Sequence, residues 1–173
     1  MAKIFIGIPS IRQDKDFIES MQKFLPELAK IHTIECVEVR NRPVDEARNM
    51  IVDFFLERDY DYLLFLDDDH SEHTIEMVET LLKPNEYVCA MKCYAKNFPY
   101  FCTLADYQEH DSEYGRYQSK ELKGGYHYCD LVGFGMTLIK RETFKFLNKP
   151  YFVCINDTRE DNYFCDNLHF KGI

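Results

Sequence analysis

Three consecutive carboxylates, Asp67, Asp68 and Asp69, directly follow the apolar run from Tyr62 to Leu66. Adjacent carboxylates repel one another unless water or a cation screens them, and no Lys or Arg stands in the immediate neighbourhood. Oxygen donors of this kind suit a hard divalent cation, with Mg²⁺ or Mn²⁺ preferred over Zn²⁺. The cluster therefore predicts a metal site.

A second interpretation of the same stretch needs no metal. Asp69 would cap the following helix in a solvated turn, and Glu72, three residues later, would complete a capping box. The two interpretations are compatible, because a capping carboxylate keeps an oxygen for another partner.

The run that precedes the aspartates is apolar at every position rather than at every second one. This pattern is typical of a strand buried on both faces of a parallel sheet. Such a strand has to end before the aspartates, because charged groups lose their hydration when they are buried. The predicted strand ends at Leu66 and puts the carboxylates at its carboxyl end, where open α/β sheets bind their ligands.

The first half of the chain alternates between strand and helix patterns. The predicted strands are residues 3–8, 34–39, 62–66 and 87–93, and the predicted helices start at residue 16, at residues 43–44 and at residue 73, the last ending at residue 82. This order predicts the α/β class, with a parallel sheet and right-handed crossovers.

The second half is less regular. We expect a short strand at residues 101–106, a mobile hairpin or loop at 107–125 and a long strand-like run at 126–140. Short helices are expected at 141–147 and 161–170. The strand-like run is interrupted by Gly133-Phe134-Gly135, which indicates either a bulge or a close approach of backbone, by a neighbouring chain segment or by a substrate.

Two further groups of polar residues could act in chemistry. Arg48 and Asn49 lie in the predicted second helix, either on a solvated face or where Arg48 reaches an anionic ligand at the sheet edge. Glu160 and Asp161 suit the start of a helix, since acidic residues are favoured there. If the fold brings them near the aspartates, one of them could act as a general base.

Composition limits the classes of protein to consider. A chain of 173 residues fits one domain, and its net charge of −9 argues against a general nucleic-acid surface. The seven cysteines are odd in number and lack CxxC spacing, which favours reduced thiols in a cytoplasmic protein over disulfides or zinc. We expect neither a signal peptide nor an integral membrane segment.

The ordered motifs resemble a GT-A-type glycosyltransferase domain of the family-2-like kind. The segments that carry the resemblance are KIFIGIP at the start, Ala47-Arg48-Asn49, LLFLDDD with its DxD motif, VGFGMTLIKRETF, Pro150-Tyr151-Phe152 and the segment from Glu160 to Cys165. The resemblance implies a GT-A, Rossmann-like, mostly parallel sheet flanked by helices, in one domain spanning 1–173. Residues 1–100 would form a nucleotide-binding half and 101–173 a smaller acceptor-side β/α portion.

The same resemblance implies a UDP- or GDP-sugar donor and a Mn²⁺ or Mg²⁺ ion. Pro9 and Ser10 would border the nucleotide base, and Arg48 would lie near the base or the phosphates. Asp67 would approach the ribose and the metal, and Asp69 would bind the metal that bridges the diphosphate. Asp68 is grouped with the donor-binding residues. The metal would neutralise the departing diphosphate as a Lewis acid.

Asp161, with Glu160 beside it, is the expected catalytic base of an inverting, hexosyltransferase-like reaction with an unknown acceptor hydroxyl. A retaining reaction would not need that base. One feature departs from the family: members often have a later histidine that completes the metal shell, and His169 does not match that position. Either fewer protein ligands hold the metal, or the chain is truncated, or the domain is not active alone.

Two other functions remain open. A haloacid-dehalogenase-like phosphohydrolase also places D-x-D after an apolar strand, with the first aspartate, here Asp67, as nucleophile. A non-catalytic nucleotide-binding module of the same fold is the other alternative. Loss of p-nitrophenyl phosphate turnover in Asp67→Asn would favour the phosphohydrolase.

Overall fold

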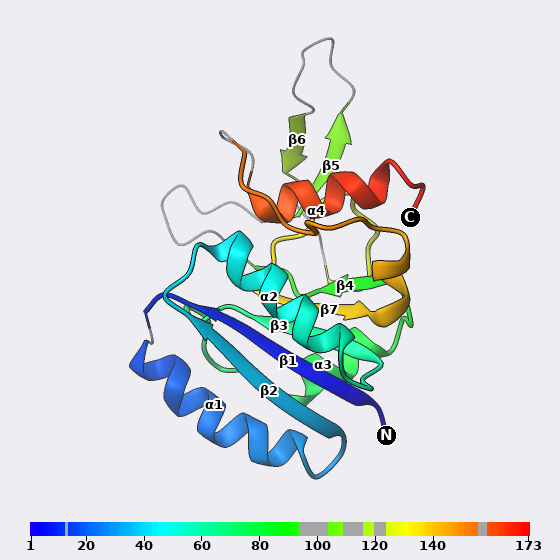
Figure 1. Cartoon of the computed structure of the whole chain (residues 1–173). Helices are drawn as coiled ribbons and strands as arrows, with labels where there is room; N and C mark the ends of the chain where they lie inside the picture. Colours follow the sequence, from blue (N-terminus) through cyan, green and yellow to red (C-terminus); the bar gives the residue numbers. More distant parts are fainter. Residues whose placement is uncertain (13, 94–103, 109–115, 120–123, 156–158) are drawn as a thin grey trace.

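The computed structural model describes all residues except 13, 94–103, 109–115, 120–123 and 156–158. A twisted five-stranded sheet has helices on both faces, and a two-stranded hairpin projects beyond it (Figure 1). The strands are β1 Lys3–Ser10, β2 Thr33–Arg40, β3 Tyr62–Leu66, β4 Val88–Ala90, β5 Ala105–Gln108, β6 Arg116–Ser119 and β7 Met136–Lys140. The helices are α1 Lys15–Leu28, α2 Val44–Leu56, α3 Ile75–Leu82, the 3₁₀ helix η1 Arg141–Lys145 and α4 Glu160–His169.

The predicted burial of the strands on both faces is confirmed. Alternate residues of β3 enter different cores: Leu63 and Phe65 pack with α2 and α4, whereas Leu64 and Leu66 pack with α1 and α3. All four of these side chains are fully buried. Strand β3 is therefore fixed from both sides, and so is the direction in which the chain leaves it at Asp67.

The sheet contains one antiparallel strand, β7, which the alternation of strands and helices in the first half of the chain did not predict. The order is β2-β1-β3-β7-β4, so β7 separates β4 from β3 and runs antiparallel to both. Four residues of β7 are buried, whereas all of β4 is half-exposed, as expected for an interior strand and an edge strand. Four of the five strands still run in the same direction, which makes the sheet mostly parallel.

The insertion of β7 brings a late part of the chain to the aspartates. Because β7 is antiparallel, its amino end lies at the same edge of the sheet as the carboxyl end of β3, and Leu66 pairs with Met136. The backbone N–H of Asp67 donates to the carbonyl of Gly135 at 3.1 Å. The glycine segment therefore lies against the carboxylate cluster.

Several predicted bounds change. The strand expected at 126–140 is limited to β7, the strand expected at 87–93 is limited to β4, and the helix expected from residue 73 begins at Ile75. The helices expected at 141–147 and 161–170 are confirmed as η1 and α4. The hairpin expected at 107–125 is confirmed for the described residues, where β5 pairs antiparallel with β6.

The other predictions about the chain have mixed outcomes. The predicted boundary between two halves, near residue 100, lies outside the described residues. No disulfide joins the six described cysteines, and Cys165 alone among them is buried. No helix within the described residues is both long and apolar enough to cross a bilayer.

Candidate active site

The predicted site residues come from four elements that meet at one edge of the sheet. One hydrogen bond joins the end of β1 to the segment after β3. An arginine of α2 then bonds both to this segment and to the start of α4. The residues concerned are Ser10, Arg48, Asp67, Asp68 and Glu160. Pro9, one residue before Ser10, is buried within β1 and pairs with Val39 of β2.

Arg48 lies at the centre of this group. Its Nη2 donates to Asp67 Oδ1 at 3.0 Å and its Nε donates to Glu160 Oε1 at 3.3 Å. The guanidinium also lies over the rings of Phe65 and Phe134, at 5.2 and 5.0 Å from their centroids. Arg48 is only 2% exposed. This burial favours a role in holding two carboxylates in place over direct contact with a phosphate.

Asp68 has a structural role that the sequence does not suggest. Its Oδ2 accepts hydrogen bonds from Ser10 Oγ at 2.8 Å and from the backbone N–H groups of Ile11 and Arg12 at 3.1 Å each. These contacts tie the loop after β1 to the segment after β3. The carboxylate fixes the shape of this edge, and one of its oxygens is fully used in doing so.

Asp67, Asp69 and His70 form a group whose possible ligand atoms all lie within 4.8 Å of one another. Burial raises the pKa of Asp67, the Arg48 guanidinium opposes this, and the nearby Asp69 carboxylate adds to the increase. Such a carboxylate gains from a cation that replaces its lost hydration. His70 is the member of this group that was not predicted from the sequence.

The capping box predicted at Asp69 is wrong. The residue that caps α3 is Thr74, whose Oγ1 accepts from the backbone N–H of Met77 at 3.3 Å. Glu72 has a left-handed backbone conformation, with φ 63°, and lies before the helix. Asp69 therefore lies five residues before the cap, and its side chain is half-exposed. The capping part of the interpretation that needed no metal is therefore wrong, whereas the exposure of Asp69 agrees with the solvated turn that it also assumed.

Gly135 is required for the position of His70. A Cβ atom at Gly135 would lie 2.8 Å from Cδ2 of the His70 ring, closer still to its Nε2, and 2.9 Å from Cys93 Sγ. Real Cβ atoms are essentially never found this close to other heavy atoms. The glycine motif therefore allows side chains to approach the backbone closely. One of these side chains, His70, belongs to the candidate metal group.

Glu160 and Asp161 begin α4 and differ in their surroundings. Glu160 is 8% exposed and is bound to Arg48. Burial, and then the charge of Glu160, raise the pKa of Asp161 to about 6, although its Oδ1 accepts from the backbone N–H of Asn162. Burial therefore outweighs the helix dipole, which would lower the pKa.

Asn49 positions the segment that leads to α4. Its Oδ1 accepts from the backbone N–H groups of Tyr151 and Phe152, and its Nδ2 donates to the carbonyl oxygens of Phe152 and Asp45. The segment is thereby held against α2 through a single side chain. The sequence places Asn49 beside Arg48 but does not predict this role, because Tyr151 and Phe152 are about 100 residues further along the chain.

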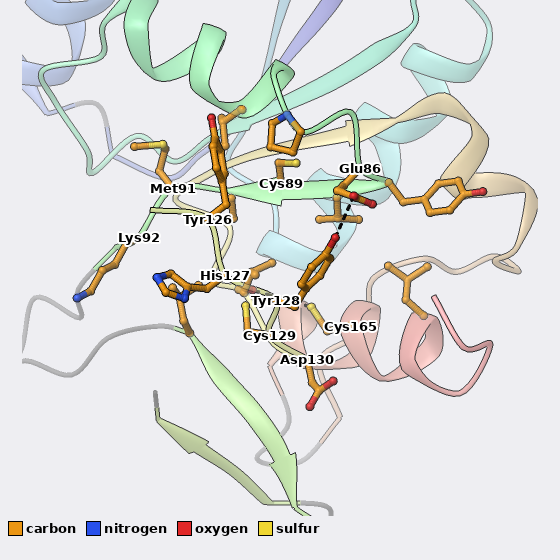
Figure 2. Close-up of a pocket in the computed structure, with 18 of the residues that line it drawn as sticks. Glu86, Cys89, Met91, Lys92, Tyr126, His127, Tyr128, Cys129, Asp130 and Cys165 are labelled. Carbon is orange, nitrogen blue, oxygen red and sulfur yellow. Dashed lines mark hydrogen bonds between the residues drawn. The ribbon is translucent and has the colours of Figure 1, made fainter. Parts of the chain in front are cut away.

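A separate cavity of about 750 Å³ lies beside the edge strand β4. Its walls come from β4, the end of α3, residues 124–132 and the second half of α4, and Figure 2 shows Tyr128 reaching across to Glu86. None of the predicted site residues lines it. One end of the cavity, at Met91 and Lys92, is adjacent to Cys93, which lies against Gly135.

Comparison with known proteins supports the fold class. No family model and no curated protein matches the chain. Among solved structures, A197 from STIV is similar, with a TM-score of 0.67 and 24% identity over 95% of this chain and 76% of A197. A glycosyltransferase involved in the glycosylation of the major capsid of PBCV-1 is a weak neighbour, with a TM-score of 0.39 and 11% identity over 86% and 69% of the two chains. The similarity to A197 shows a shared mixed α/β fold. The similarity to the glycosyltransferase is too weak to support a conclusion.

Proposed function

We propose that the protein is a metal-dependent glycosyltransferase, which moves a sugar from a nucleotide-sugar donor to an acceptor hydroxyl with inversion. The observation that carries the proposal is the meeting of two chemically distinct carboxylate groups at one sheet edge. Asp67 and Asp69 can supply oxygen ligands, and Asp161 combines burial with a pKa raised to about 6. Arg48 links the two groups through Asp67 and Glu160.

The residues present fit a Mn²⁺ or Mg²⁺ ion. Asp67 and Asp69 would hold it, since carboxylate oxygens are the donors that both ions accept. The partly buried Asp67 supports this assignment, because burial without a cation penalises its charge. A bound ion would supply charge neutralisation for a departing diphosphate. Arg48 would keep Asp67 oriented, and Asp68 would keep the loop after β1 against the site.

Asp161 would accept the proton of the acceptor hydroxyl. A carboxylate with a pKa of about 6 is mostly ionised at neutral pH and is a stronger base than an ordinary aspartate. Glu160 would keep this pKa high through its charge while its own carboxylate stays bound to Arg48.

The phosphohydrolase alternative is less consistent with the geometry. It needs Asp67 as a nucleophile, but Oδ1 of this residue accepts a hydrogen bond from the buried Arg48. Such a bond stabilises the carboxylate and lowers its nucleophilicity. A non-catalytic nucleotide-binding module would keep the same contacts and differ only in lacking turnover.

Titration with UDP, GDP and their sugars, with and without Mn²⁺, tests the proposal. We expect binding of one nucleoside diphosphate only in the presence of metal, and loss of this binding in Asp69→Asn. Asp161→Asn should retain donor binding and lose transfer. A suitable control is Asp59→Asn, since Asp59 is a 93% exposed carboxylate that pairs with Lys3 away from the site. Failure of every nucleotide to bind with metal present would overturn the proposal, and binding without transfer would indicate the non-catalytic module.

A further inference from the structure

We infer that His70 is a nitrogen ligand of the metal and that it makes the site selective for Mn²⁺ over Mg²⁺. The inference rests on the proposed metal-dependent function and adds a ligand and a selectivity to it. His70 immediately follows the aspartates, and its backbone N–H donates to the carbonyl of Asp67 at 3.3 Å. This turn brings the ring back toward the two carboxylates.

The distances within the group suit a shared ion. His70 Nε2 lies 3.6 Å from Asp69 Oδ1, too far for a hydrogen bond, and all three ligand atoms lie within 4.8 Å of one another. Ligands bound to one ion at about 2.1 Å are separated by about 3–4 Å. The group therefore needs only small side-chain adjustments to enclose an ion.

The position of the imidazole depends on a second, independent feature. Gly135 comes from the approach to β7, more than 60 residues after His70 along the chain, and a Cβ there would overlap the His70 ring. Its φ is not in the left-handed region, so the backbone does not itself require glycine. The missing side chain leaves space for an imidazole.

The chemistry of the ligands sets the selectivity. Mg²⁺ takes oxygen ligands in near-ideal octahedral geometry and keeps several waters. Mn²⁺ shares with Mg²⁺ a preference for carboxylate oxygen, but as a transition ion it accepts an imidazole nitrogen more readily than Mg²⁺ does. Two carboxylates and one imidazole therefore favour Mn²⁺, whereas the carboxylates alone would discriminate little between the two ions.

The test uses the full chain and the metal ions alone, without nucleotide. Electron paramagnetic resonance gives the Mn²⁺ affinity, competition gives the Mg²⁺ affinity, and pulsed measurements detect ¹⁴N coupled to bound Mn²⁺. We expect ¹⁴N coupling in the native protein and none in His70→Ala. That substitution should weaken Mn²⁺ binding by about tenfold or more and Mg²⁺ binding by less than about threefold.

Gly135→Ala should reproduce the loss of Mn²⁺ affinity, because the added methyl displaces the ring. The double variant with His70→Ala should be no worse than His70→Ala, since Gly135 acts through the ring. Gly124→Ala is the matched control, because a Cβ there meets nothing within 4 Å and the φ is not left-handed. His127→Ala controls for removal of another histidine. Circular dichroism establishes that each variant is folded.

The outcomes separate the two claims. Mn²⁺ binding that shows no ¹⁴N coupling, or coupling that persists in His70→Ala, would overturn the role of His70 and leave the metal site intact. Additive losses in the double variant would overturn the role of Gly135. Absence of any Mn²⁺ or Mg²⁺ binding by the native protein, with no change in Asp69→Asn, would overturn the metal-dependent function itself.

Discussion

Each end of the central sheet holds an arginine that is packed on aromatic rings, but the partners of the two arginines differ. Arg48, at the carboxyl end of β3, binds the carboxylates of Asp67 and Glu160. Arg141 lies just after β7, at the opposite end. Within the described part of the chain its side chain donates to backbone carbonyl oxygens alone, which include those of Phe55, Leu56 and Tyr60. Its guanidinium lies 4.5 Å from the centroid of the Phe55 ring.

The difference shows how the same side chain serves two purposes. The carbonyl oxygens at Arg141 include the last carbonyls of α2, which lie at the negative end of the helix dipole and are stabilised by a cation. They are neutral and would accept water if the arginine were removed. The carboxylates at Arg48 carry charge that water reaches poorly, so the arginine there balances a cluster that the fold would otherwise not retain. Charge at buried positions is expected where a protein performs chemistry.

Removal of Arg48 should have the largest effect on stability. Arg48→Met keeps the apolar volume but leaves two partly buried carboxylates without a cation, and we expect a loss of about 3–5 kcal/mol in the free energy of unfolding. Denaturant unfolding followed by circular dichroism measures it. Addition of Glu160→Gln should recover part of the loss, because one uncompensated charge is removed. The control is Arg42→Met, an exposed residue whose pair with Glu46, at 4.0 Å, contributes little.

A loss below about 1 kcal/mol for Arg48→Met, within the range of exposed pairs, would contradict this account. It would mean that solvent reaches the carboxylates readily enough to replace the arginine. The distinction between the two ends of the sheet would then have no energetic basis.

The corresponding change at the other end should cost less. Arg141→Met removes hydrogen bonds from a charged donor to several carbonyl oxygens, and we expect a loss of about 2 kcal/mol, because water can replace the donor at these half-buried groups. No single side-chain substitution should restore it, since the partners are backbone atoms. A loss equal to that of Arg48→Met would remove the distinction between carboxylate and carbonyl partners. Lys145→Met, in the same 3₁₀ helix but exposed, is a suitable control.

The sequence predicts those features of the site that depend on residues close together in the chain. Uninterrupted apolar runs predicted strands buried on both faces, and the abrupt change from Leu66 to Asp67 predicted carboxylates at a strand end. Both predictions are confirmed by the burial of β3 and by the position of the aspartates. Such features follow from the hydration of side chains close together in sequence.

The remaining features depend on contacts between distant residues. Nothing in the pattern of β7 states that it pairs with β3, because any buried strand has the same composition. Arg48 and Glu160 are 112 residues apart, and each has an ordinary local role on a helix. His70 acquires significance only when Gly135 lies against it. The carboxylates were therefore predictable, whereas the contacts of Arg48 with Asp67 and Glu160 and the contact of Gly135 with His70 were not.

The smallest expected effect is on the pH dependence of stability, which should differ between a carboxylate at the site and one at the opposite end of the sheet. Asp161, at the site, has a pKa raised from 3.8 to about 6, so the folded state binds a proton more tightly than the unfolded state. Stability from this group is present at low pH and is lost as the pH rises from about 4 through 6. At pH 7.5 the ionised, buried carboxylate costs about 1–2 kcal/mol after allowance for solvent screening.

Asp161→Asn should therefore be more stable than the native protein at pH 7.5 and no more stable at pH 4, since the amide keeps an acceptor for the N–H of Asn162 and never ionises. Asp59, at the other end, has its pKa lowered by Lys3, so Asp59→Asn should show the opposite sign: slightly less stable at pH 7.5, with the difference fading as the pH falls through the lowered value. Unfolding midpoints measured from about pH 2 to 8 give both curves, because the lowered pKa of Asp59 lies below 3.8. If both variants changed stability in the same direction at pH 7.5, Asp161 would be as well hydrated as a surface carboxylate. Its pKa would then not be raised, and the proposed role as a base would lose its support.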